Sequence, residues 1–153
     1  MRGLDGKTAV VTGGATLIGA GLVRAFRAAG VNVVIADIDK EGGQALADEL
    51  GDGVTFTATD ITDDQAIEDC VATAVDTYGR LDFVVNLACS YLDQGLDSTR
   101  ADWLASYDVN VVGAVMMTKA ALPHLKATRG AVVNFASISS KVAQTGRWLY
   151  PVS

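Results

Sequence analysis

The alternation of two patterns along the chain is the strongest constraint on its fold. Short runs of apolar and β-branched residues predict buried strands, because the strands of a parallel sheet are covered on both faces and show no polar alternation. Between these runs lie longer segments whose apolar residues recur every three or four positions, as in amphipathic helices. The predicted strands span residues 8–12, 31–36, 54–58, 83–87 and 131–135.

The helical segments are recognised by their apolar faces and by the glycines that follow several of them. Asp63 or Asp64 stands near the start of the third helix, and Pro123 is expected to kink the fourth or to lie near its end. Strands that alternate with helices predict an α/β fold, with a doubly wound parallel sheet and helices on both faces. The apolar faces comprise Ile18, Leu22, Val23, Phe26 and Ala29, then Ala45, Leu46 and Leu50, then Ile67, Val71, Ala74 and Val75, and finally a stretch from about Arg100 to Leu125.

Length and composition exclude several classes of protein. The 153 residues contain no visible repeat or linker, so one domain spanning residues 1–153 is predicted. The net charge of −6 argues against a nucleic-acid surface, which needs clustered lysine and arginine. Two cysteines argue against a disulfide framework, and no apolar stretch approaches the roughly 20 residues that span a bilayer. A soluble cytoplasmic protein without a membrane anchor or a metal site is expected.

A glycine-containing turn, Thr12–Gly19, follows the first predicted strand and leads into the first helix. In a doubly wound fold this is where a pyrophosphate meets the helix N-terminus, and small residues allow the backbone to approach it. Gly13 and Gly19 fit this requirement. Taken alone, the turn is equally well explained as a plain strand-to-helix connection, because a single glycine motif is weak evidence.

Asp37 strengthens the case for a dinucleotide site. It ends the second strand, about 20 residues after the glycines, where a carboxylate accepts hydrogen bonds from the ribose hydroxyls. The same charge would repel a 2′-phosphate, and the turn from Gly13 to Gly19 contains no lysine or arginine to neutralise one. NAD is therefore predicted in preference to NADP.

Ser137 and Tyr150 are the candidate catalytic pair. Ser137 follows the fifth predicted strand, and Tyr150 comes 13 residues later. Each residue alone has an ordinary explanation, a polar loop for the serine and a half-buried aromatic residue before Pro151 for the tyrosine. Together with the glycine turn they resemble the short-chain dehydrogenase/reductase family, whose active-site motif is Tyr-x-x-x-Lys.

The resemblance implies a Rossmann-like fold and an oxidoreductase that transfers a hydride between NAD and a secondary alcohol or ketone. It implies that Tyr150 is the acid/base, that Ser137 orients the substrate oxygen, and that Asn110 helps to hold a water molecule. Tyrosine is a poor base at its reference pKa of about 10, so a nearby ammonium group is needed to favour the phenolate. Ser137 is preferred to Ser139 and Ser140 because the family pattern at the strand end and the spacing to Tyr150 select it.

The family also places cofactor contacts at the ends of the first four strands, although the chain departs from its pattern at Leu17, Leu87 and Cys89. Leu17 replaces the middle glycine of the turn, and Cys89 is interpreted as a packing residue. Asp60 has an equally good explanation as a helix cap. The implied cofactor-binding residues are Gly13, Thr16, Leu17, Ile18, Gly19, Asp37, Ile38, Asp60, Ile61, Asn86 and Ala88.

The lysine of the family motif would fall at position 154, one residue beyond the sequence. We therefore expect residues 1–153 to be a truncated part of a longer protein, inactive alone and lacking its C-terminal strands and helices. The full-length protein is expected to form a homo-oligomer, either a tetramer or a dimer.

A second hypothesis is a non-catalytic dinucleotide-binding or interaction module, which the departures from the family pattern favour. The substrate pocket is expected to be bordered by residues 139–149. In that segment Arg147 could meet a carboxylate and Trp148 could cover a ring, but simple exposure of either residue is the alternative. Ser90 and Tyr91, after the fourth strand, could also contribute.

Overall fold

The sheet is parallel throughout and has the strand order β3-β2-β1-β4-β5. The computed structural model describes residues 3–153. The direction of the strand order reverses between β1 and β4, and doubly wound sheets bind their ligands at such a switch point. The strands are β1 (Thr8–Thr12), β2 (Asn32–Asp37), β3 (Val54–Ala58), β4 (Phe83–Asn86) and β5 (Ala131–Asn134).

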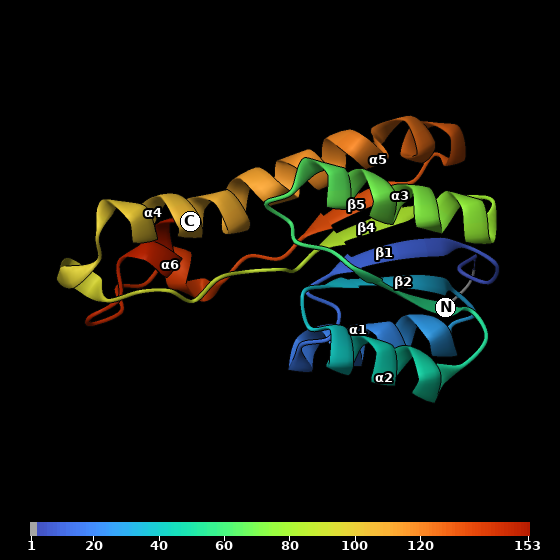
Figure 1. Ribbon diagram of the computed structural model, residues 1–153, viewed down its shortest axis with the longest axis horizontal. Coiled ribbons are helices and arrows are strands. Elements are labelled where there is room, and N and C mark those ends of the chain that lie inside the picture. The colour runs from blue at the N-terminus through green and yellow to red at the C-terminus, as the bar shows by residue number, and fades with distance from the viewer. Residues whose placement is uncertain (1–2) are drawn as a thin grey trace.

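Helices cover both faces of the sheet, as Figure 1 shows, with α1 and α2 on one side and α3 and α5 on the other. The shortest helix, α6, lies beside α4 at the end of the molecule that projects beyond the sheet. The α-helices are α1 (Leu17–Ala28), α2 (Lys40–Leu50), α3 (Asp64–Tyr78), α4 (Arg100–Tyr107), α5 (Ala114–Thr128) and α6 (Leu149–Val152). The predicted doubly wound α/β fold is confirmed.

The core consists of two apolar layers, one on each face of the sheet. Successive side chains of a strand point to opposite faces. Val10 and Val84 accordingly pack in the layer beneath α3 and α5, whereas Val11 and Val85 pack in the layer beneath α1 and α2. All four valines are buried. This double burial explains why the central strands read as uninterrupted apolar runs.

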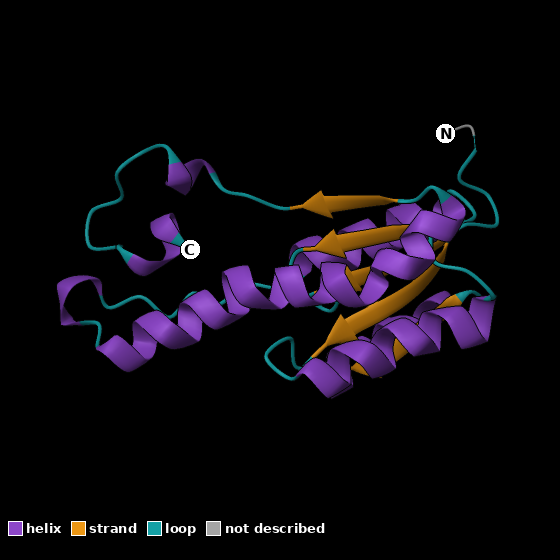
Figure 2. Cartoon of the chain, turned by 90° about the horizontal axis from the view of Figure 1, so that it is seen from above, coloured by secondary structure: helices purple, strands orange, loops and turns teal. Residues whose placement is uncertain are grey.

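The strand β5 forms one edge of the sheet and is more open than the others. It pairs with β4 in parallel, and Val133 leaves 48% of its surface exposed. The chain that follows β5 leaves the sheet as a long loop and returns toward α4 and α6 (Figure 2). This loop brings Ser137 and Tyr150 to the same end of the molecule as the carboxyl ends of the strands.

The predicted strands match the observed ones to within one residue, but one helix differs from prediction. Helix α2, whose apolar face was predicted, begins at Lys40, because the Asp39 side chain accepts a hydrogen bond from the Gly42 N–H and caps it. The helix predicted over residues 100–125 contains a π-helical turn at Asp108–Gly113 between α4 and α5. Pro123 lies inside α5, which continues to Thr128.

A buried carboxylate joins the starts of β1 and β4. The Asp82 side chain is fully buried and accepts hydrogen bonds from Lys7 Nζ (3.1 Å), the Thr8 N–H (3.0 Å) and the Arg80 guanidinium (2.7 and 2.8 Å). Burial raises the pKa of this carboxyl, but these donors outweigh it and hold the pKa below its ordinary value.

Within residues 3–153, no helix has the length and apolar character needed to cross a membrane.

Candidate active site

The turn after β1 approaches the end of β4 closely. Gly13 has a φ of 66°, and a Cβ atom at this position would lie 2.9 Å from the Ala88 Cα. Glycine is therefore needed here for two reasons, the positive φ and the close approach of two backbones. Thr16 then caps α1, since its hydroxyl accepts a hydrogen bond from the Gly19 N–H and donates one to the Gly13 carbonyl.

Asp37 lies beside this turn and supports it. The Ala15 N–H donates to Asp37 Oδ2 (2.9 Å), and the Asp39 N–H donates to Oδ1 (3.0 Å). Only 8% of Asp37 is exposed, which fixes the direction of its carboxylate. Each carboxylate oxygen has about two lone-pair sites, so both can accept a further hydrogen bond from a ligand hydroxyl.

A cavity of about 440 Å³ opens above the turn at the carboxyl ends of β1, β2 and β3. Most of the predicted cofactor-binding residues line it. The exceptions are Gly19, which is buried beneath the turn, and Asn86, which lines the neighbouring cavity. The predicted residues on its wall are Gly13, Thr16, Leu17, Ile18, Asp37, Ile38, Asp60, Ile61 and Ala88.

The rim of this cavity is apolar. Leu17, Ile38 and Ile18 line it and are 92%, 71% and 58% exposed. Ile18 and Ile38, on the same wall as the Asp37 carboxylate, suit a ligand with flat apolar faces and a few hydroxyl groups, such as an adenosine. Asp60, by contrast, bonds its own turn, since its Oδ1 accepts from the Thr62 N–H and hydroxyl.

We expect Leu17→Gly to tighten NAD binding. Leu17 is the first residue of α1 and stands on the cavity wall, where its side chain occupies space beside the helix N-terminus. Removing it should lower the Kd roughly fivefold, the factor that corresponds to about 1 kcal/mol. Isothermal titration of the full-length protein with NAD measures this change. Leu17→Ala, which keeps the helix propensity, should give an intermediate Kd, and weaker binding by both variants would contradict the expectation.

A second cavity of about 850 Å³ contains the three predicted catalytic residues on its wall: Ser137, Tyr150 and Asn110. It adjoins the first cavity, because residues at the ends of β1 and β4 line both. The shared residues are Thr12, Ile18, Ile61, Leu87, Ala88, Cys89 and Tyr91. A ligand that fills the first cavity can therefore extend toward Ser137 and Tyr150.

Ser137 and Tyr150 reach this cavity from the long loop after β5. The Ser137 hydroxyl donates to Ser139 Oγ (3.0 Å) and accepts from the Ser139 N–H (3.1 Å), which fixes its position. Ser139 is buried and does not line the cavity, whereas Ser140 does. The Tyr150 ring packs against the Tyr91 ring with 4.8 Å between the centroids.

Asn110 lies in the π-helical turn and connects three segments of the chain. Its Oδ1 accepts from the Ser90 N–H (2.6 Å), and its Nδ2 donates to the hydroxyl of Ser153 (2.7 Å), to that of Ser106 and to the Ser90 carbonyl. A π-helical turn often marks a functional site, because it redirects side chains that a regular helix would place elsewhere. Here it directs an amide between the loop after β4 and α6.

Asn86 has a supporting position at the end of β4. Its Nδ2 donates to Asn134 Oδ1 (2.8 Å), Thr118 Oγ1 (3.2 Å) and the Ala114 carbonyl (3.3 Å), and so joins β4 to β5 and α5. Its Oδ1 is buried and has no partner among residues 3–153. Buried polar atoms ordinarily have a hydrogen-bond partner, so this oxygen is an exception next to the larger cavity that Asn86 lines.

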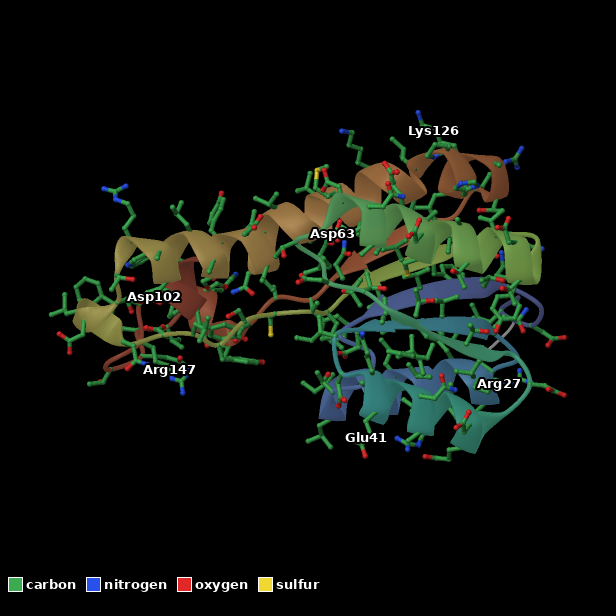
Figure 3. All side chains as sticks on the ribbon, in the orientation of Figure 1. Arg27, Glu41, Asp63, Asp102, Lys126 and Arg147 are labelled. Atoms are coloured by element: carbon green, nitrogen blue, oxygen red, sulfur yellow. The ribbon has the colours of Figure 1, made fainter. Side chains whose placement is uncertain are left out.

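One expectation about the site is wrong, and one residue was not predicted. Cys89 is exposed rather than packed, because it follows the end of β4 where the chain leaves the sheet. Arg147 and Trp148 are exposed and do not line the large cavity, as one of the two alternatives for them had it. Arg147 lies on a loop at the end of the molecule that projects beyond the sheet (Figure 3). Tyr91, expected as a possible contributor, lines both cavities. Asp93 was not predicted.

Comparisons with known proteins agree with this geometry. The family model described as "short chain dehydrogenase" matches residues 7–153. The L-fucose dehydrogenase of Oryctolagus cuniculus is 40% identical over 141 residues, which cover 91% of this chain and 49% of that protein. The sorbitol dehydrogenase of Cereibacter sphaeroides is 36% identical over 137 residues, which cover 88% of this chain and 54% of that protein.

A solved structure extends the likeness to three dimensions. The 3-ketoacyl-(acyl-carrier-protein) reductase from Brucella melitensis, complexed with NADH, superimposes with a TM-score of 0.91 at 28% sequence identity. The match covers 97% of this chain and 64% of that chain. The fold and its paired cavities define a doubly wound α/β protein with two adjoining cavities at the carboxyl ends of its strands. The chain belongs to the short-chain dehydrogenase family, and it spans about half the length of the curated relatives it matches.

Proposed function

We propose that the protein is an NAD-dependent oxidoreductase that transfers a hydride between the cofactor and a secondary alcohol or ketone. The observation that carries this proposal is the placement of Ser137 and Tyr150 on one cavity wall that continues into the cavity holding Asp37. A module that only bound a dinucleotide would not need a serine and a tyrosine at its far end.

The proposed reaction couples a proton transfer, made by side chains of this protein, to a hydride transfer. A bound nicotinamide would accept or donate the hydride. In the oxidation direction the Tyr150 phenolate oxygen takes the proton from the substrate hydroxyl, and in reduction the phenol returns it. On substrate binding the Ser137 hydroxyl would turn its one proton from Ser139 Oγ to the substrate oxygen and fix the position of that oxygen. Asn110 holds the loop after β4 and the end of α6 in place around this oxygen.

The relatives support an alcohol or a ketone as the substrate. Two of them are named as dehydrogenases of L-fucose and sorbitol, and the structural relative is named as a ketoacyl reductase. The activities that these names describe all convert a carbon between the alcohol and the carbonyl state. The apolar wall formed by Leu122, Val115 and Phe135 favours a substrate with an apolar part next to that carbon.

The preference for NAD over NADP rests on Asp37. Its carboxylate is nearly buried, is held by two backbone N–H groups, and points to the first cavity. Hydroxyl groups of a ribose are good donors to such an anion, whereas a 2′-phosphate would be repelled by it.

Replacing Asp37 with alanine tests this preference. We expect the Kd for NAD to rise about tenfold or more, since a hydrogen bond to a charged group is worth roughly 1.5–3 kcal/mol. The Kd for NADP should change less, so the ratio between the two cofactors falls. Fluorescence titration with NADH and NADPH measures both constants. Asp48→Ala, which removes an exposed carboxylate from α2, is the matched control. An unchanged ratio would show that the dinucleotide site lies elsewhere.

A further inference from the structure

Asp93 binds the backbone of the segment that carries Tyr150. It lies between β4 and α4, far from Tyr150 in the sequence. The Trp148 N–H lies 2.8 Å from Asp93 Oδ2 and 3.0 Å from Oδ1, and the Tyr150 N–H donates to Oδ2 at 3.1 Å. The Gly95 N–H donates to Oδ1 from within the same loop (2.9 Å). One carboxylate therefore joins two loops that are more than fifty residues apart in the chain.

The segment that Asp93 holds has little other support from regular structure. Helix α6 has four residues, and the first N–H groups of a helix have no partner within it. Over residues 3–153, no other side chain accepts a hydrogen bond from the N–H of Trp148 or Tyr150. Asp93 is thus the side chain that binds the backbone at the start of α6, while the buried Leu149 packs beneath it and Asn110 binds Ser153 at its other end.

The charge state of Asp93 suits this role. Partial burial raises the pKa of the carboxyl, but the backbone N–H groups of Trp148, Gly95 and Tyr150 outweigh it and lower the pKa below its ordinary value. The side chain is therefore an anion over the neutral range, and hydrogen bonds to an anion are roughly twice as strong as those between neutral groups.

The same loop also contacts the Tyr150 side chain. Tyr91, two residues before Asp93, packs its ring against the Tyr150 ring. The loop after β4 therefore fixes Tyr150 at two points, with Asp93 at the backbone and Tyr91 at the ring. Cys89 and Tyr91 of this loop also line both cavities. The loop therefore connects the segment that carries Tyr150 to the walls of the two cavities.

We propose that Asp93 is a positioning residue, which holds Tyr150 at the wall of the large cavity through the backbone of residues 148–150. Its catalytic consequence rests on the proposed function, in which Tyr150 transfers the substrate proton. Asp93 itself acts through Tyr150 and has no contact with the reacting atoms. Loss of its carboxylate is expected to release the backbone of residues 148–150 while leaving the smaller cavity intact, because Asp93 does not line that cavity.

Hydrogen exchange of the full-length protein tests the anchoring without any need for activity. We expect Asp93→Asn to speed amide exchange in residues 147–152 by about tenfold and Asp93→Ala to speed it further, since asparagine keeps one acceptor oxygen. Exchange in α3, which is remote from the loop, should not change and shows that both variants are folded. Asp97→Asn is the matched control, because it removes an exposed carboxylate from the same loop region. Unchanged exchange in residues 147–152 would overturn the proposal.

Steady-state kinetics test the catalytic consequence on the same proteins. Asp93→Asn should lower kcat about tenfold while the Kd for NADH stays within about twofold. The unchanged exchange in α3 excludes a smaller folded fraction as the cause of the lower kcat. Unchanged kcat alongside faster exchange would overturn the positioning role. If the wild-type protein shows no turnover with any secondary alcohol, the proposed function fails, and faster exchange in residues 147–152 still supports Asp93 as the anchor of Tyr150.

Discussion

Replacing Tyr150 with phenylalanine is expected to lower kcat of the full-length protein by roughly 100- to 10,000-fold, the range that a positioned acid/base contributes. The variant keeps the ring that packs against Tyr91 and loses the phenol oxygen alone. Binding of NADH should therefore remain within about twofold of the wild-type Kd, because Tyr150 does not line the smaller cavity. Stopped-flow absorbance of NADH formation and fluorescence titration together measure the two effects.

Tyr91→Phe is the matched control for this prediction. It removes a phenol from the neighbouring position on the same cavity wall. Hydrogen bonds to Cys89 and then to Tyr150 raise the pKa of Tyr91, which disfavours its phenolate form. We expect its loss to change kcat far less than the loss of the Tyr150 phenol. Equal losses in the two variants, or full activity of Tyr150→Phe, would show that the acid/base has been assigned to the wrong residue.

The fold could be predicted from the sequence because its signals are local. Each buried strand is a short apolar run, and Asp37 marks the end of β2 where the chain leaves the core. The start of α2 could not be read from its apolar face, because that face begins well after the cap, Asp39. The π-helical turn carries no comparable signal, since the residues Asp108–Gly113 have the composition of an ordinary helix and only long-range packing decides the extra residue.

The site could be predicted only where a residue type and a spacing coincide. Ser137 and Tyr150 were found in this way, and the structure brings them to one cavity. Asp93 was missed because an aspartate in a loop usually binds its own turn, as Asp60 does, and nothing local indicates a partner in a distant segment. Cys89 was misjudged because a residue at a strand end is buried or exposed according to where the following loop goes.

The second large effect is expected at Asp82, whose replacement should lower stability more than that of any surface carboxylate. Asp82→Asn keeps the shape of the side chain but removes the charge that Lys7 and Arg80 face. We expect the free energy of unfolding to fall by roughly 1.5–3 kcal/mol, the worth of a hydrogen bond to a charged group, because Lys7 and Arg80 are partly exposed and lose a charged acceptor without being left buried. Urea denaturation at pH 7 measures this change.

The stability difference between the wild-type protein and Asp82→Asn should depend on pH, and the lowered pKa of Asp82 determines the direction of that dependence. The folded protein holds this pKa below its ordinary value, so the carboxylate stabilises the fold fully above the unfolded-state pKa of about 3.9. Its contribution is lost as the pH falls through the lower folded pKa, and the wild-type protein and Asp82→Asn should then unfold at similar urea concentrations. Glu49→Gln, which breaks the exposed pair with Arg24, is the control and should change little. A stability difference at Asp82 that persisted unchanged into acid would mean that shape, and not charge, joins β1 to β4.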